Sequence, residues 1–234
     1  MFLTLSCNEI DKPEILVFTK TAGYRHESIE AGIEAIKKIG AENSFVVDVS
    51  ENADIFTKEN LTRYAAVIFL NTSGDVLDSA QQLSFEQYIR SGGGFTGIHA
   101  ASDTEPDWPW FQQLVGATFK NHPPVCKATL KVVENNHPAT AMLPEIWERT
   151  DEWYNFKWRN PEVTPLILLD ETSYEGGENG DYHPIAWFHE FDGGRAFYTG
   201  GGHTKETFSE PLFLQHLLGG IRYAMGISQT KSHF

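Results

Sequence analysis

The first hundred residues alternate between short, mostly apolar runs and longer segments in which apolar residues recur at helical spacing. The apolar runs predict buried strands at 14–19, 44–49, 65–70 and 95–98. Between them, the helical periodicity predicts a helix over 27–39 capped by Gly40, a short helix from about Thr57, and a helix over 79–90 opened by a capping box at Ser79. This alternation is typical of a parallel sheet with helices on both faces.

The second half of the chain is less regular. Residues 100–165 are rich in Pro, Trp and His, and only 126–133 predicts a strand there; another short apolar run follows at 166–169. Two apolar runs flank Asp192-Gly193-Gly194, which predicts an antiparallel hairpin near 185–199. A final helix is expected over 209–225. The fold class predicted is therefore α/β, a three-layer arrangement around a mostly parallel sheet.

Polar, glycine-rich segments follow four of the predicted strands. They are Lys20–His26, Asn71–Gly74, His99–Asp103 and Gly200–Thr204. Because ligands bind beyond the carboxyl ends of parallel strands, these segments are expected to meet at one edge of the sheet. Three of the four contain a histidine, which favours a functional pocket over a set of unrelated loops.

His99 is the clearest candidate for chemistry. The stretch Gly94-Phe-Thr-Gly-Ile-His99 predicts a strand that runs into a turn and displays His99 as a nucleophile elbow displays its nucleophile. Histidine there suits a general base, a metal ligand or a hydrogen-bond donor. We predict that His99 and His203 act as a catalytic pair, that Asp103 orients His99, and that Glu152 assists. The alternative for His99 is a structural role, with its ring bonded to a loop carbonyl, and the alternative for His203 is a plain loop with glycine turns.

His99, His203 and Asp103 are also candidate ligands for a divalent metal, although no dedicated metal-binding spacing occurs in the chain. The sequence specifies no other cofactor. Glu206 is expected to orient His203.

Carboxylates beside flat aromatic rings suit the hydroxyl groups and C–H faces of sugars. Asp151-Glu152-Trp153-Tyr154 combines both, and two X-Pro turns carry histidines. The predicted contacts to a carbohydrate are Tyr24, His26, Asn71, His122, Trp153, Tyr154 and His183. Most tryptophans are nevertheless expected in the core, and His137, His189 and His216 are expected to be structural.

The composition limits the kinds of ligand and site that this protein can have. The formal charge of −14, from 32 acidic and 18 basic residues, argues against nucleic acid and anionic lipid, whereas a neutral sugar or a cation is compatible. Two cysteines exclude a disulfide framework and a four-cysteine zinc site. Gly92-Gly-Gly-Phe-Thr-Gly97 matches a dinucleotide-binding pattern but ends a helix and enters a strand, so that function is rejected. No apolar run is long enough for a transmembrane segment.

The N-terminal residues allow two hypotheses. Met1-Phe-Leu-Thr-Leu-Ser-Cys7 is similar to the end of a bacterial lipoprotein signal, which would make Cys7 the lipidated residue and place the protein in the periplasm or on a membrane. The other hypothesis is a short leader on a cytoplasmic protein.

Several ordered motifs resemble the ThuA-like, or trehalose-utilization, family. They are Gly23–His26, Gly92–Thr104, Leu114–Phe119, His122-Pro123, Asp151–Tyr154, His183–Trp187, Gly194–Thr199 and Gly202-His203. The resemblance covers about 13–226 and implies a class I glutamine amidotransferase-like, or flavodoxin-like, fold. It divides the chain into a leader at 1–12, a single ThuA-like domain at 13–227 and a tail at 228–234.

The resemblance implies carbohydrate catabolism, with a keto-sugar supplied by a partner sugar oxidoreductase. Gly97-Ile98-His99 has histidine where amidotransferases have cysteine, so glutamine hydrolysis by a thiolate is rejected. Two functions stay open. One is a hydrolase, lyase or isomerase acting on a glycoside or keto-sugar through histidine acid/base or metal-assisted chemistry. The other is a non-catalytic sugar-binding or regulatory module that lacks the nucleophile.

Overall fold

The computed structural model describes residues 12–227 of the chain. The proposed lipidation of Cys7, the predicted tail at 228–234 and all of the predicted leader except Lys12 lie outside the described residues.

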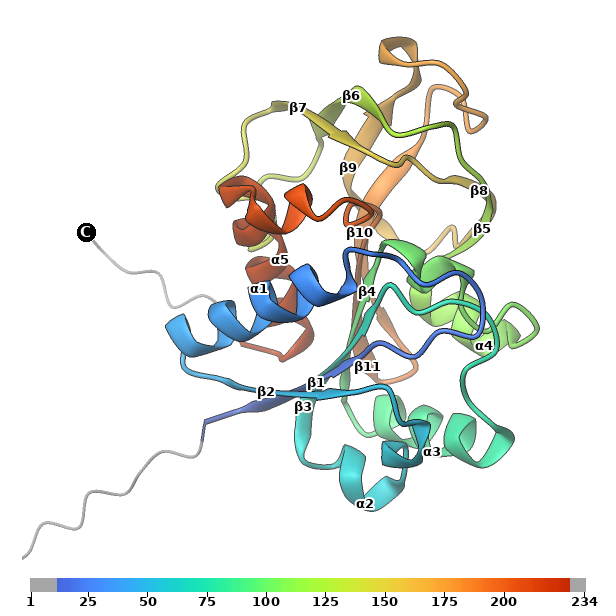
Figure 1. Cartoon of the computed structure of the whole chain (residues 1–234), viewed down its shortest axis with the longest axis vertical. Coiled ribbons are helices and arrows are strands. Elements are labelled where there is room, and N and C mark those ends of the chain that lie inside the picture. Colours follow the sequence, from blue (N-terminus) through green and yellow to red (C-terminus); the bar gives the residue numbers. More distant parts are fainter. Residues whose placement is uncertain (1–11, 228–234) are drawn as a thin grey trace, which may run out of the picture.

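Five parallel strands form one half of a nine-stranded sheet, in the order β2-β1-β3-β4-β11 (Figure 1). They are β1 (Glu14–Phe18), β2 (Val46–Ser50), β3 (Tyr64–Leu70), β4 (Gly94–Ile98) and β11 (Gly194–Thr199). The apolar runs predicted as strands are these elements. β4 is buried throughout, as expected of a central parallel strand covered on both faces.

The other half of the sheet is antiparallel and continues from β11 in the order β10-β9-β6-β7. Its strands are β6 (Cys126–Val132), β7 (Ile146–Asp151), β9 (Thr164–Asp170) and β10 (Pro184–Phe191), and a separate ribbon pairs β5 (Ala117–Asn121) with β8 (Asn155–Arg159). The predicted hairpin is β10–β11. The sequence did not predict β7, because its inward positions Trp147, Arg149 and Asp151 are mostly charged.

Helices cover both faces of the sheet (Figure 1). α1 (Ile29–Glu42) and α5 (Pro211–Ala224) lie together on one face, and α2 (Lys58–Leu61), α3 (Ser79–Arg90) and α4 (Pro109–Val115) lie on the other. Phe213, Leu217, Ile221 and Ala224 form the fully buried stripe of α5, as their spacing predicts.

Two predicted helix ends were wrong. Gly40 lies inside α1, where a Cβ atom would come within 2.6 Å of Val47, so this glycine permits close helix–strand packing and is not the cap. The capping box of α3 begins at Asp78, one residue earlier than predicted, because the Asp78 carboxylate accepts hydrogen bonds from Ala80 and Gln81.

The core between the sheet and the helices α2, α3 and α4 is rich in aromatic rings. Phe69 packs against five other rings, those of Phe18, Phe56, Phe85, Phe95 and Phe111. His189 and His216 are buried and bonded to backbone carbonyls, in agreement with their predicted structural role. Within residues 12–227, none of the helices is both long and apolar enough to cross a bilayer.

The strand directions determine which loops meet. Four antiparallel pairings separate β7 from β11, so the two strands run in the same sense and end at the same edge of the sheet. A hydrogen bond from the Gly202 amide to the Asp151 carboxylate, 2.9 Å long, shows that the sheet curls enough to bring these ends together. The loop after β7 therefore joins those after β1, β3, β4 and β11.

Candidate functional site

His99 occupies a strained position at the end of β4. Its φ of +47° lies in the left-handed region, which is unfavourable for a non-glycine residue, and its side chain is fully buried. Nδ1 lies 2.8 Å from the carbonyl oxygen of Gly200, which can only accept, so Nδ1 carries the proton and Nε2 keeps a lone pair when the ring is neutral. We predicted that Asp103 orients the His99 ring. This prediction was wrong, because the contact at Nδ1 that orients the ring is made by the Gly200 carbonyl.

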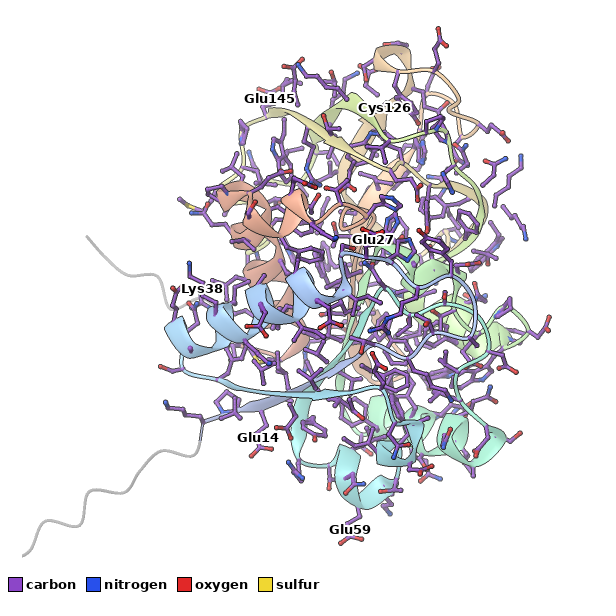
Figure 2. All side chains as sticks on the ribbon, viewed as in Figure 1. Glu14, Glu27, Lys38, Glu59, Cys126 and Glu145 are labelled. Atoms are coloured by element: carbon purple, nitrogen blue, oxygen red, sulfur yellow. The ribbon has the colours of Figure 1, made fainter. Side chains whose placement is uncertain are left out.

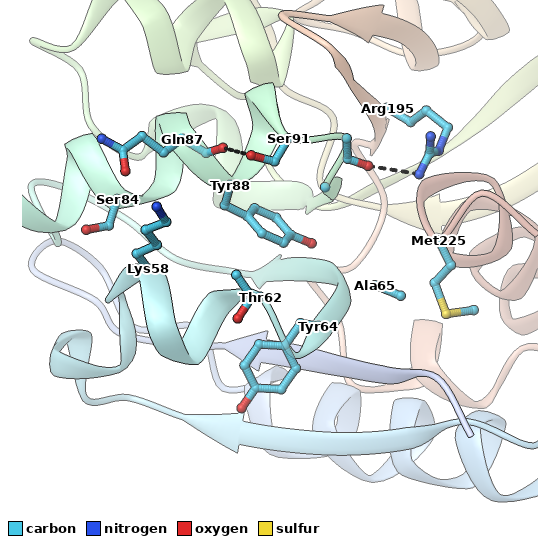
Figure 3. A pocket seen from close by; sticks show the side chains of 12 residues that line it. Lys58, Thr62, Tyr64, Ala65, Ser84, Gln87, Tyr88, Ser91, Arg195 and Met225 are labelled. Atoms are coloured by element: carbon cyan, nitrogen blue, oxygen red, sulfur yellow. Dashed lines mark hydrogen bonds between the residues drawn. The ribbon is translucent and has the colours of Figure 1, made fainter. Parts of the chain in front are cut away.

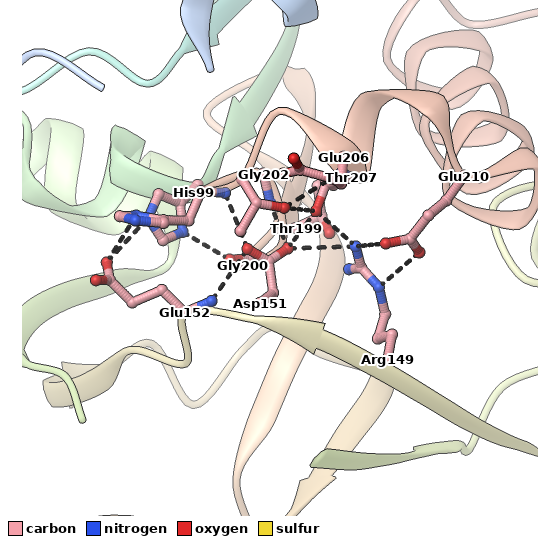
Figure 4. Close-up of polar contacts among 12 residues, drawn as sticks. His99, Arg149, Asp151, Glu152, Thr199, Gly200, Gly202, Glu206, Thr207 and Glu210 are labelled. Atoms are coloured by element: carbon pink, nitrogen blue, oxygen red, sulfur yellow. Dashed lines mark hydrogen bonds and ion pairs between the residues drawn. The ribbon is translucent and has the colours of Figure 1, made fainter. Parts of the chain in front are cut away.

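Three imidazoles and one carboxylate converge beside this elbow. The side chains of His26, His99, Glu152 and His203 each place one potential ligand atom within 4.8 Å of the others. Glu152 Oε2 lies 3.4 Å from His99 Nε2 and 3.1 Å from His203 Nδ1 (Figure 4). The structure thus brings His99 and His203 to one site, and it adds His26, which the sequence predicted only as a sugar contact.

The cluster has unusual electrostatics. Burial would raise the pKa of Glu152, but the neighbouring His203 and His99 outweigh it and lower the pKa to about 2. The Glu152 carboxylate raises the pKa of His203, whereas burial and the neighbouring imidazoles lower the pKa of His26 to about 3. Glu152 is therefore an anion at neutral pH, His26 is neutral, and the carboxylate favours the protonated form of His203.

Asp151 holds two segments of the site together. Its buried carboxylate accepts hydrogen bonds from the backbone amides of Glu152, Gly202 and His203, and from the Thr207 hydroxyl, at distances from 2.9 to 3.1 Å (Figure 4). The Arg149 guanidinium lies 3.2 Å from it and also pairs with Glu210. His203 is thus positioned by Asp151, and not by Glu206 as predicted.

Gly202 makes this arrangement sterically feasible. Its φ is +126°, and a Cβ atom there would lie 2.9 Å from Ile98. The sequence could not have identified Asp151 as the anchor of this loop, because 51 residues separate it from Gly202. The only signal was its place beside Glu152 in the Asp151–Tyr154 motif.

Through His203 the cluster borders an open cleft of about 430 Å³, a size typical of small-molecule sites. Tyr24 and His203 line this cleft. His122 has a half-exposed side chain whose Nδ1 lies 2.9 Å from Glu152 Oε1. Tyr154 is buried against His99, with ring centroids 4.2 Å apart.

Other predicted sugar contacts are not accessible. Trp153 is fully buried, and its Nε1 donates to the Cys126 carbonyl. His183 is buried with both ring nitrogens engaged, one by Glu171 and one by the Tyr154 carbonyl. These two predictions were wrong because the aromatic and imidazole rings fill the core beneath the site instead of lining it.

Asn71 and Asp103 lie near the site without joining the cluster. Asn71 is buried and donates to Ser28 and the Gly202 carbonyl, so it braces the loop. Burial raises the pKa of Asp103, and the four clustered residues do not include it. Cys126 lies in β6, and burial raises the pKa of its thiol, so it does not replace the missing nucleophile (Figure 2).

A second cavity, of about 370 Å³, lies where β3, β4 and β11 begin (Figure 3). Its lining includes Lys58, Tyr64, Tyr88 and Arg195 but neither a histidine nor a carboxylate. It is therefore at the opposite edge of the sheet from the histidine cluster and offers no comparable set of groups for acid–base or metal chemistry.

Solved structures with this fold were compared with the chain. A ThuA-like protein from Bacteroides uniformis ATCC 8492 is 26% identical, with a TM-score of 0.77 over 93% of this chain and 94% of the other. A ThuA-like protein from Parabacteroides merdae ATCC 43184 is 18% identical, with a TM-score of 0.74 over 94% and 93% of the two chains. A β-galactosidase from Rahnella sp. R3 is 14% identical and has a TM-score of 0.61; 93% of this chain matches 32% of that one, which shows the fold alone.

No curated protein matches the sequence. The family model for ThuA, described as trehalose utilisation, matches residues 14–224 and so spans every described strand and helix from β1 to α5. The amidotransferase-like α/β fold, the ordered motifs and this match agree, and the chain belongs to the ThuA family.

Proposed function

We propose that this protein is an enzyme of carbohydrate catabolism that moves a proton next to the carbonyl group of a keto-sugar. The observation that carries the proposal is the cluster of three imidazoles around the Glu152 carboxylate, adjoining the cleft of about 430 Å³. Proton removal beside a carbonyl needs a base and a group that stabilises the enolate oxygen, and a histidine-rich site can supply both.

His122 is the base that fits best. Its Nδ1 faces Glu152 Oε1 at 2.9 Å and the Pro123 carbonyl at 3.0 Å, so the proton of the neutral ring belongs on Nδ1. The His122 side chain is 40% exposed, so Nε2 is then free to accept a proton from a substrate. Glu152 would orient this ring through the contact at Nδ1, as a carboxylate does in other catalytic pairs.

A second histidine of the site, His203, would stabilise the enolate. His203 lines the cleft, so an N–H of its ring can donate a hydrogen bond to a developing oxyanion. The same enolate serves isomerisation and β-elimination of a glycosidic bond. A keto-sugar must be made by oxidation of a sugar hydroxyl, which is why a partner sugar oxidoreductase is part of the proposal.

Exchange of the proton beside the carbonyl for deuterium from the solvent tests the proposal directly. Keto-disaccharides would be incubated with the protein in deuterated buffer and followed by NMR. We expect His122→Gln to slow exchange by roughly 10²–10⁴-fold without unfolding the protein. His189→Gln, a buried histidine far from the cleft in sequence and bonded only to Leu114, is the control. Equal exchange in His122→Gln and the unaltered protein would contradict the assignment of the base.

The absence of a nucleophile at the elbow favours a second candidate, a sugar-binding module without catalysis, because His99 stands where the fold's amidotransferases have cysteine. This candidate predicts that keto-sugars bind without exchange or turnover. It also predicts that His99→Ala reduces affinity only modestly.

A further inference from the structure

We propose that His26, His99, His203 and Glu152 bind a divalent transition metal ion of the zinc type. This inference deepens the function proposed above, since the metal would be the group that holds the carbonyl oxygen. Metal binding itself does not depend on that function and can be measured without any substrate.

Three ring nitrogens in the cluster lack the partner that a buried polar atom normally has. Among the described residues, His26 Nδ1, His99 Nε2 and His203 Nδ1 are buried atoms without a hydrogen bond. His26 and His99 are 4% and 0% exposed, so solvent does not satisfy them either. Glu152 Oε2 lies near His99 and His203 but outside hydrogen-bonding geometry, which a shared cation would explain.

The four residues of the cluster belong to segments that are distant in the sequence. His26 follows β1, His99 follows β4, His203 follows β11 and Glu152 follows β7. Their ring centroids are 4.9 Å apart for His26 and His99, 5.2 Å for His26 and His203, and 5.3 Å for His99 and His203. Neutral rings gain little from such edge-on contacts, whereas a central cation would bind all the lone pairs at once.

The groups behind the cluster orient it toward one centre. The Gly200 carbonyl keeps the His99 proton on Nδ1 and leaves the Nε2 lone pair for a metal. His122 engages Glu152 Oε1, which leaves Oε2 facing His99 and His203. Asp151 fixes the backbone of both Glu152 and His203. Metal sites typically have such supporting contacts, which set the tautomer and ring orientation of the ligands.

The donor set indicates the class of metal. Imidazole suits zinc, iron, nickel and copper, whereas magnesium and calcium prefer oxygen ligands, and the cluster contains no thiolate. Four protein ligands complete a tetrahedral zinc site, so a substrate oxygen would bind as a fifth ligand, from the cleft that His203 borders.

The test begins with purified protein stripped with a chelator and reloaded with Zn²⁺, Mn²⁺, Co²⁺ or Ni²⁺. We expect one metal per chain by elemental analysis, and visible d–d absorption from the Co²⁺ form. His26→Ala, His99→Ala and His203→Ala should each weaken metal affinity by about 100-fold or more, since loss of a supporting contact alone costs 10–100-fold. His189→Gln should bind like the unaltered protein.

Circular dichroism with chelator present identifies any variant that fails to fold, and X-ray absorption of the unaltered Zn²⁺ form then gives an independent readout. Imidazole scattering from several histidines supports the site. Absence of stoichiometric metal, or a metal shell without histidine, overturns it.

The two proposals fail in different ways. Stoichiometric metal that is lost in His26→Ala, with no deuterium exchange in any keto-sugar, would retain the metal site and reject the function. Exchange that persists undiminished in chelator-stripped protein, together with no stoichiometric metal after reloading, would retain the function and overturn the metal site.

Discussion

Replacing Asp151 by asparagine should destabilise the protein strongly, although the change alters only one atom of the side chain. The buried carboxylate accepts four hydrogen bonds and faces Arg149 at 3.2 Å. Asparagine has one carbonyl oxygen and one NH2 group, so the NH2 group must face either the amides of Glu152 and His203 or the Gly202 amide and the Arg149 guanidinium. Arg149 would keep Glu210 as its only carboxylate partner.

The cost follows from these contacts. Leaving a buried amide without an acceptor costs about 1–3 kcal/mol, and breaking one side of a buried ion pair costs about 3–5 kcal/mol. Because the two effects share the same atoms, they do not add fully, and we expect a loss of about 3–5 kcal/mol in the free energy of unfolding. The variant should also misplace His203 and weaken metal affinity.

Urea unfolding at neutral pH, followed by circular dichroism, measures this loss. Asp48→Asn is the matched control, because Asp48 also pairs with an arginine, Arg63, but is 40% exposed, and it should cost about 0–1 kcal/mol. If both variants lost the same small free energy, Asp151 would not be the anchor described here. A normal free energy of unfolding with abolished metal binding would mean that the carboxylate acts only locally.

Three further outcomes are expected. His216 is buried with a pKa lowered to about 4 by desolvation, so the unfolded chain binds a proton first as the pH falls below 6.5. This histidine should account for about 2 kcal/mol of the stability lost by pH 5, and urea titrations should find the loss smaller by that amount in His216→Gln, since His26 and His137 also have lowered pKa values. Gly202→Ala should cost about 1–3 kcal/mol in the same assay, because its φ is +126° and the new Cβ would meet Ile98; an unchanged midpoint would show that the loop adapts. Tyr24→Ala, at a residue 64% exposed on the cleft, should raise KM for keto-sugar exchange while stability stays within about 0.5 kcal/mol; an unchanged KM would remove Tyr24 from the substrate site.

Local patterns sufficed for much of the fold. The strands β1, β3 and β4 are continuous apolar runs because a central parallel strand is buried on both faces, and such runs are visible without any knowledge of neighbours. The hairpin β10–β11 was equally clear from its Asp-Gly-Gly turn. The middle of the chain was harder, because β7 turns Arg149 and Asp151 toward the interior and so lacks the hydrophobic alternation that identifies a strand.

For the site, the sequence showed which residues follow the predicted strands, and that selected His26, His99 and His203, while the Asp151–Tyr154 motif selected Glu152. It could not separate them from Trp153 and His183, which have similar local surroundings but fill the core. That separation depends on the curl of the antiparallel half, which brings the end of β7 against the loop after β11. Because contacts between such distant segments depend on three-dimensional packing and not on local pattern, only the tertiary structure decided that Glu152 lies among the three imidazoles.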